Sequence, residues 1–190
     1  GTGLTRTATF TPTANTASSN ASITVTANSY QDVPGNNGSA GTSPAISIDM
    51  VAPSVAITSN VSAVKAGDTA NITFTFSEDP GNTFVWNGTA GDVTLSHDTL
   101  SAISGTGVTR TAVFTPTPSL NAGTAGISVT ADTYQDAAGN NGSTGVSSNL
   151  SLDTLAPSIA SLALSSATGA VASPLDATVK LLNAADTLSA

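Results

Sequence analysis

The segment Ala131-Asp-Thr-Tyr-Gln-Asp-Ala-Ala-Gly-Asn-Asn-Gly-Ser143 has a near-copy at Ala27-Asn-Ser-Tyr-Gln-Asp-Val-Pro-Gly-Asn-Asn-Gly-Ser39. Each copy follows an alternating apolar segment and ends in a run of Gly and Asn, a pattern typical of a strand that enters a tight loop. Each loop also places carboxylate and amide oxygens at short spacing, in a chain with only 8% charged residues. Because hard cations bind such oxygen clusters, the repeated loop predicts both a repeated β-structure and a repeated cation site.

The two loops belong to a longer internal repeat with a constant offset of 104 residues. Thr5 matches Thr109, Asp49 matches Asp153, and 28 of 51 positions are identical over the aligned stretch that begins at Thr5. The alignment needs no gap. A constant offset over that length indicates a tandem array with a domain-sized period.

The offset divides the chain into three parts. Residues 1–49 are the C-terminal half of one repeat, residues 50–155 are a complete repeat, and residues 156–190 begin a further, divergent repeat. The last part is identified by residues 184–187, which repeat the turn at 66–69 with about 14 extra residues before it. Since both ends of the chain fall inside a repeat, we expect it to be a piece of a longer protein.

The complete repeat alternates short apolar segments with turn signals. Its clearest strand is 70–77, where Ile72, Phe74 and Phe76 alternate with Asn and Thr. The segments 92–96 and 99–103 are expected to pair with each other. Seven or so short strands without a helix pattern predict an all-β fold of tandem immunoglobulin-like β-sandwiches, with a barrel as the alternative. The other expected strands are 54–58, 83–86, 109–115, 125–131 and 149–153.

The composition excludes several classes of partner. The net charge is −8 and only four residues are basic, namely Arg6, Lys65, Arg110 and Lys180. We therefore expect no binding to nucleic acid or to anionic membranes. No apolar run approaches the roughly 20 residues that cross a bilayer, so membrane insertion is not expected. The sequence has no cysteine, and its stability must come from the core or from another kind of cross-link.

The topology of a seven-strand sandwich predicts where the acidic loops meet. Its strands run alternately up and down, so the start of the first strand, the loop after the second and the loop before the last lie at one end. A divalent cation would neutralise carboxylates gathered there and fix the angle between repeats. The candidate Ca²⁺ ligands are Asp49, Glu78, Asp79, Asp132, Asp136, Asn140 and Asp153, together with Asp32 and Asn36 in the first copy.

Not all of these positions are equivalent. Asn28 replaces Asp132 in the first copy, so that site would be weaker or differently coordinated. Asp153 is expected to serve the next junction. Any single loop is also explained by ordinary Asx-turns, and the hypothesis of a metal site depends on the convergence of several segments.

The pattern Asp-x-x-x-Asp-Ala-Ala-Gly-Asn at 132–140, followed by Asp-Thr-x-Ala-Pro-Ser at 153–158, resembles the bacterial immunoglobulin-like repeats of giant surface adhesins, including RTX-type and biofilm-associated adhesins exported by type I secretion. The resemblance covers residues 1 to about 159. It implies a non-enzymatic, extracellular extender on the bacterial cell surface. Calcium would stiffen the repeats, and other domains would bind a host or abiotic surface. It implies calcium ligands among Asp49, Asp132, Asp136, Asn140 and Asp153.

Two rival functions remain open. In the first, the chain is a filament or lattice subunit whose half-repeats complement one another between copies, which predicts self-association. In the second, it is a carbohydrate-binding module, for which Trp86 and Tyr134 are the candidate aromatic platforms. The lone His97 lies in no triad-like motif, and we predict no catalytic residue.

Overall fold

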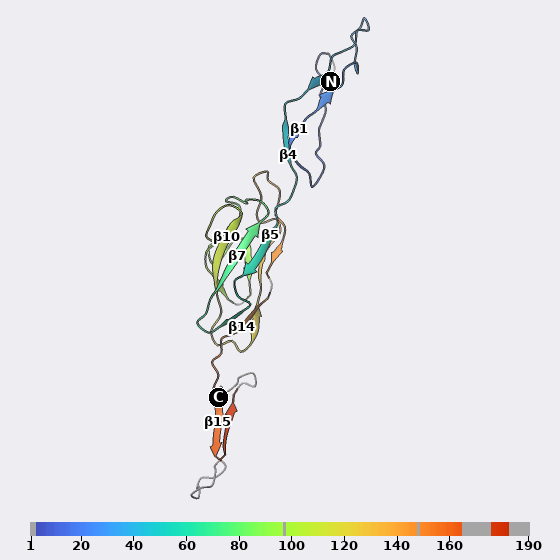
Figure 1. Cartoon of the computed structure of the whole chain (residues 1–190). Coiled ribbons are helices and arrows are strands. Elements are labelled where there is room, and N and C mark those ends of the chain that lie inside the picture. The colour runs from blue at the N-terminus through green and yellow to red at the C-terminus, as the bar shows by residue number, and fades with distance from the viewer. Residues whose placement is uncertain (1–2, 97, 148, 165–175, 183–190) are drawn as a thin grey trace.

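The computed structural model describes residues 3–96, 98–147, 149–164 and 176–182. These residues form strands, turns and loops without a helix, as the alternating sequence pattern predicts, and a helix able to cross a bilayer is accordingly not found among them. Figure 1 shows three successive parts: a β-ribbon near the N-terminus, a central sandwich, and a hairpin near the C-terminus.

One layer of the sandwich is a four-stranded antiparallel sheet in the order β5–β7–β10–β9. In β7, alternate residues from Ala70 to Phe76 are buried and the polar residues between them face outward. This is the pattern expected of a strand with one face on the core. The four strands are β5 (Val55–Ser59), β7 (Ala70–Phe76), β9 (Thr99–Leu100) and β10 (Thr109–Thr115).

The opposite layer consists of two three-stranded sheets, β11–β14–β6 and β13–β12–β8. The pairing of β14 with β6 is parallel, and the other pairings are antiparallel. Side chains of both layers meet in one apolar core. The strands are β6 (Ala63–Lys65), β8 (Val93–Leu95), β11 (Gly123–Ala125), β12 (Ile127–Val129), β13 (Gly145–Val146) and β14 (Leu150–Asp153).

An aromatic cluster fills one end of this core. The rings of Phe74, Phe76, Phe84 and Tyr134 lie with centroids 4.8 to 5.9 Å apart in tilted or edge-to-face arrangements, which aromatic pairs prefer. Tyr134 is completely buried and comes from the repeated Gly/Asn-rich loop. The loop is therefore anchored in the core.

The structure corrects one expected strand and one expected pairing. Residues 83–86 form a loop with one isolated bridge, between Trp86 and Gly91, because a side-chain carboxylate takes the place of a strand partner. Asp92 Oδ2 accepts a hydrogen bond from the Val85 amide at 2.7 Å. The expected pairing of 92–96 with 99–103 is also wrong, since β8 pairs with β12 and β9 pairs with β10 in the opposite layer.

The flanking parts are single ribbons. Near the N-terminus, β1 (Ala17–Ala21) pairs with β4 (Ile46–Asp49), and β2 (Thr24–Val25) pairs with β3 (Gly41–Thr42). Near the C-terminus, β15 (Ile159–Leu164) pairs with β16 (Ala177–Leu181). The turn expected at 184–187 lies outside the described residues.

Candidate metal centre

The loop between β12 and β13 holds the carboxylate of Asp136 in a fixed position. Asp136 Oδ1 accepts hydrogen bonds from the amides of Ala138 and Asn140, each at 2.9 Å. Asp136 Oδ2 accepts another from the side-chain amide of Asn140, also at 2.9 Å. Asp136 is buried, with 7% of its surface exposed. A buried carboxylate held by several donors is positioned before any ligand arrives.

Close packing between Tyr134 and Gly142 sets the shape of this loop. A β-carbon at Gly142 would lie 2.1 Å from the Tyr134 ring, so the ring can lie against the backbone only because this residue is glycine. The Tyr134 hydroxyl lies 3.2 Å from the carbonyl oxygen of Pro53 and 3.0 Å from that of Ser143. The Ser143 amide donates to the same Pro53 oxygen at 2.9 Å. These contacts tie the loop to the linker that follows β4.

Asp49 is the last residue of β4 and begins that linker. Its Oδ1 accepts a hydrogen bond from the Val51 amide at 3.1 Å, and its backbone oxygen accepts one from the Asn140 side chain at 3.2 Å. Asp49 and Asn140 are 91 positions apart in the sequence. The junction between the N-terminal ribbon and the sandwich is therefore held by direct hydrogen bonds.

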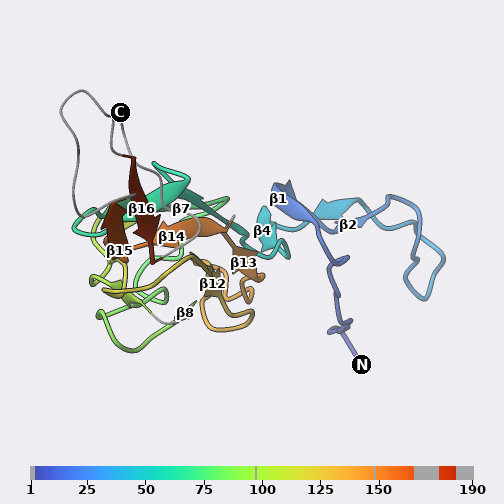
Figure 2. The same cartoon turned by 90° about the horizontal axis from the view of Figure 1, so that it is seen from below.

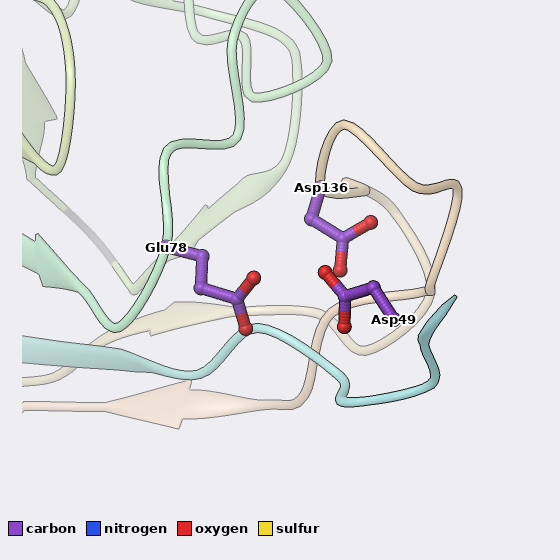
Figure 3. Close-up of side chains that lie close together, drawn as sticks. All are labelled: Asp49, Glu78 and Asp136. Carbon is purple, nitrogen blue, oxygen red and sulfur yellow. The ribbon is translucent and has the colours of Figure 1, made fainter. Parts of the chain in front are cut away.

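Three carboxylates converge at this junction. Asp49, Glu78 and Asp136 each offer an oxygen, and these three oxygens lie within 4.8 Å of one another. Figure 3 shows the side chains facing one another from β4, the loop after β7, and the loop between β12 and β13. Asp49 and Glu78 are half-buried. This is the convergence of three segments that the topology predicts.

The spacing suits a calcium ion. Calcium lies about 2.3 to 2.6 Å from its oxygen ligands, so two ligands on opposite sides of one ion are roughly 5 Å apart. Three oxygens within 4.8 Å of one another therefore fit around a single ion. Carboxylate oxygens are hard ligands that both calcium and magnesium bind. Calcium accepts a flexible arrangement of them, whereas magnesium requires a stricter octahedral geometry.

The surroundings of the cluster shift the pKa values of Glu78 and Asp136 in opposite directions. Desolvation, and then the negative charges of Asp49 and Asp136, raise the pKa of Glu78 above its ordinary 4.5. Desolvation also acts to raise the pKa of Asp136, but the hydrogen bonds from Asn140, Ala138 and Gly139 outweigh it and lower that pKa below 3.8. Asp136 is therefore held as a carboxylate, and Glu78 bears the repulsion that a divalent ion would relieve.

Other candidate ligands lie outside this trio. Asp79 forms an ion pair with Arg110 at 3.3 Å, and the Arg110 guanidinium also donates to the Gly81 oxygen at 3.2 Å. Asp132 is exposed with a φ of 64°, much like Asn28 at the matching position with a φ of 66°. Asp153 is also exposed, and its Oδ1 accepts a hydrogen bond from the Leu155 amide at 3.3 Å.

The first copy of the loop repeats the internal geometry of the second. Asp32 accepts hydrogen bonds from the backbone and side-chain nitrogens of Asn36 at 2.7 and 2.8 Å. These bonds lower the pKa of Asp32, and the bond from the Asn36 side chain has the largest effect. Asp32 is exposed and belongs to no cluster of three acidic residues within the described part of the chain. The loop thus forms from its own sequence, whereas the cluster needs the neighbouring segments.

Sequence reasoning does not predict two side chains that position the site. It gives Tyr134 only as a possible sugar platform and Arg110 only as one of four basic residues. Both recur at the offset of 104, as Tyr30 and Arg6, and that recurrence was the available signal. Arg110 holds Asp79 and Gly81 beside Glu78, so it fixes the loop that carries one of the three carboxylates.

The two candidate platform residues differ in their exposure. Trp86 is half-buried against the core and its indole nitrogen donates to the Leu100 oxygen at 3.3 Å, while Tyr134 is fully buried. His97 lies outside the described residues.

Comparison with protein families identifies the fold. A family model described as a bacterial Ig-like domain matches residues 1–48 and again residues 49–154. The chain belongs to the bacterial Ig-like domain family. A search of curated proteins gave no match. Bacterial Ig-like domains are typically non-enzymatic and are often found in surface or extracellular proteins. The boundary between the two matched Ig-like segments falls at Asp49, the residue that carries the first carboxylate of the trio.

Proposed function

We propose that this chain is a spacer segment of a bacterial surface adhesin, and that a calcium ion at each junction makes successive Ig-like domains rigid. The observation that carries the proposal is that Asp49, the last residue of β4 in the N-terminal ribbon, meets Glu78 and Asp136 of the sandwich. An ion bound by all three would link two domains rather than stabilise one loop. Regions that bind a host or abiotic surface would lie in other domains of such an adhesin.

The proposed mechanism is mechanical. Without an ion, the junction is held by the Asn140 bond to Asp49 and by the contacts to Pro53, while the carboxylates repel one another. A bound calcium ion would attract all three carboxylates and so offset their mutual repulsion. It would also restrict the conformations of the linker. Tandem domains joined in this way would behave as a stiff rod, which suits the task of projecting a binding region away from the cell.

Hydrogen exchange tests the rigid junction directly. In calcium, backbone amides of linker residues 50–52 and of the loop 136–142 should exchange more slowly than in EDTA, because bound ligand suppresses local opening. The loop 66–69 precedes β7, at the opposite end of that strand from Glu78, and serves as the internal control. In Asp136→Asn the calcium effect should disappear. Equal exchange of the wild-type junction with and without calcium would refute the proposed role of the ion.

A further inference from the structure

The sequence contains three Asn-Gly pairs, at 37–38, 87–88 and 141–142. In such a pair the backbone nitrogen of glycine can attack the side-chain carbonyl carbon of asparagine, because glycine has no β-carbon that obstructs the approach. All three asparagine side chains are exposed. Exposure therefore does not distinguish the three pairs, but their hydrogen bonds do.

The two pairs in the repeated loop are held in an unreactive arrangement. Each glycine amide donates to a tyrosine carbonyl oxygen at 2.8 Å, and each asparagine Oδ1 accepts a hydrogen bond from a glutamine side chain, at 2.8 Å in the first copy and 2.7 Å in the second. Attack by either glycine nitrogen would break its hydrogen bond to tyrosine. The partners are Tyr30 and Gln31 in the first copy, and Tyr134 and Gln135 in the second.

The pair Asn87-Gly88 has the opposite arrangement. Asn87 Oδ1 accepts three hydrogen bonds, from the Thr89 amide at 2.9 Å, the Thr89 hydroxyl at 3.0 Å and the Ala90 amide at 2.9 Å. The Gly88 amide donates to no acceptor within the described part of the chain. Donors aimed at a carbonyl oxygen stabilise the negative charge that develops there during nucleophilic attack. This turn therefore places an activated carbonyl next to an unengaged nitrogen.

Water reaches the turn at 87–90. The turn precedes β8, an edge strand of its sheet, at the outer margin of the sandwich (Figure 2). Asn87, Thr89 and Ala90 are exposed. Gly88 has a φ of 100°, a conformation that favours glycine, so the turn itself calls for the residue that permits the attack. A hydrolytic reaction at this turn therefore has its second reactant, water, at hand.

We propose that Asn87 is a site of spontaneous deamidation. The Gly88 nitrogen loses its proton to hydroxide and forms a bond to Asn87 Cγ, and the three donors hold the resulting oxyanion on Oδ1. The Cγ–Nδ2 bond then breaks, and the side-chain nitrogen leaves as ammonia after it gains a proton from water. Water adds to either carbonyl group of the succinimide ring and opens it to aspartate or isoaspartate. The turn gains a negative charge, and isoaspartate also lengthens the backbone by a methylene group.

Peptide mapping of the full chain tests this proposal. Trypsin cleaves after lysine and arginine, and the four basic residues place the three Asn-Gly pairs in separate peptides, 7–65, 66–110 and 111–180. After several days at mildly alkaline pH, peptide 66–110 should carry most of the mass increase that replacement of an amide by a carboxylate causes, and fragmentation should place it at Asn87. We expect Asn87 to react at least about tenfold faster than Asn37 or Asn141, because donors to an oxyanion lower the barrier.

The same incubation in denaturant is the reference. Unfolding removes the hydrogen bonds of all three pairs, so their rates should become similar. A folded chain in which Asn87 reacts no faster than Asn37 and Asn141 would overturn the proposal. So would a preference for Asn87 that persists in denaturant, because the local sequence rather than the folded turn would then cause it.

Thr89→Val tests the side-chain donor. Valine keeps the β-branched shape and the backbone amide but removes the hydroxyl that donates to Asn87 Oδ1, so the rate at Asn87 should fall severalfold. Ser143→Ala makes the corresponding change after Gly142 and should leave the rate at Asn141 unchanged. An unchanged rate at Asn87 in Thr89→Val would show that the turn does not stabilise the oxyanion, and the proposed cause of the reaction would fail.

Discussion

The side-chain nitrogen of Asn140 lies 3.2 Å from the backbone oxygen of Asp49 and donates a hydrogen bond to it. The same nitrogen donates to Asp136 Oδ2 at 2.9 Å. One amide group therefore joins the last residue of β4 in the N-terminal ribbon to the loop between β12 and β13, and orients one of the three carboxylates at this junction.

Replacement of Asn140 by Ala should weaken this junction. The variant loses both hydrogen bonds, and we expect a loss of about 1 to 3 kcal/mol in the free energy of unfolding because one acceptor is a buried carboxylate. Asn36→Ala is the matched control, since it removes the same intraloop bond in the exposed first copy. Chemical denaturation of both variants in EDTA measures the difference. Equal losses would show that the link to Asp49 contributes nothing.

Tyr134→Phe should destabilise the chain, while Tyr30→Phe should not. Removal of the Tyr134 hydroxyl takes away a hydrogen bond that links the loop to the Pro53 or Ser143 carbonyl in the interior, at a cost of about 1 to 3 kcal/mol. Tyr30 occupies the matching position but is half exposed, so water can bind its hydroxyl group. Thermal unfolding of the two variants checks this expectation, and similar midpoints would contradict it.

Glu78→Gln should raise the unfolding midpoint in EDTA and lower it in calcium. In EDTA the substitution removes a desolvated charge that Asp49 and Asp136 repel, so the unfolding midpoint should rise. In calcium it removes a proposed ligand, so the midpoint should fall below that of the wild type. Asp132→Asn, which places in the second loop the residue found at Asn28, should behave like the wild type in both buffers. A fall in both conditions for Glu78→Gln would mean that protein contacts, not an ion, hold its carboxylate.

The stability of the calcium-free chain should depend on pH through Glu78 and Asp136, whose pKa values are shifted in opposite directions. In EDTA, protonation of Glu78 favours the folded state. This contribution is complete below pH 4.5 and is lost as the pH rises through the raised pKa. Asp136 has the opposite sign, and its contribution is lost only as the pH falls through its lowered pKa, below 3.8.

Calcium needs Glu78 ionised. The calcium-induced rise in the unfolding midpoint should therefore be greatest near neutral pH and should shrink as the pH falls through the raised pKa of Glu78, while Asp136 is still a carboxylate. Calcium titrations at several pH values measure this decline. A calcium response that is constant until Asp136 itself becomes protonated would exclude Glu78 as a ligand.

The sequence predicts the fold well where its pattern is local. The alternation in 70–77 and 109–115 identifies β7 and β10 almost to the residue, because one buried face imposes a period of two. It fails at 83–86, where Asp92 binds the Val85 amide with its side chain. A side-chain acceptor of this kind leaves no periodic signal in the sequence.

The candidate site, like the fold, is predicted only in part by the sequence. Up-and-down topology is enough to predict that Asp49, Glu78 and Asp136 approach one another, since it depends only on the order of strands. It does not predict that Arg110 draws Asp79 aside, nor that the loop turns Asp132 outward with a positive φ. Both depend on side-chain contacts between residues far apart in the sequence.

The most direct measurement of the central hypothesis is thermal unfolding of the wild type and of Asp136→Asn in EDTA, magnesium and calcium. Calcium at about 100 times its dissociation constant stabilises the folded state by about 2.7 kcal/mol, which corresponds to a rise of the wild-type midpoint on the order of 10 °C. Magnesium should give a much smaller rise, and Asp136→Asn should lose most of the calcium effect. An unchanged wild-type midpoint in saturating calcium would contradict the account of the junction.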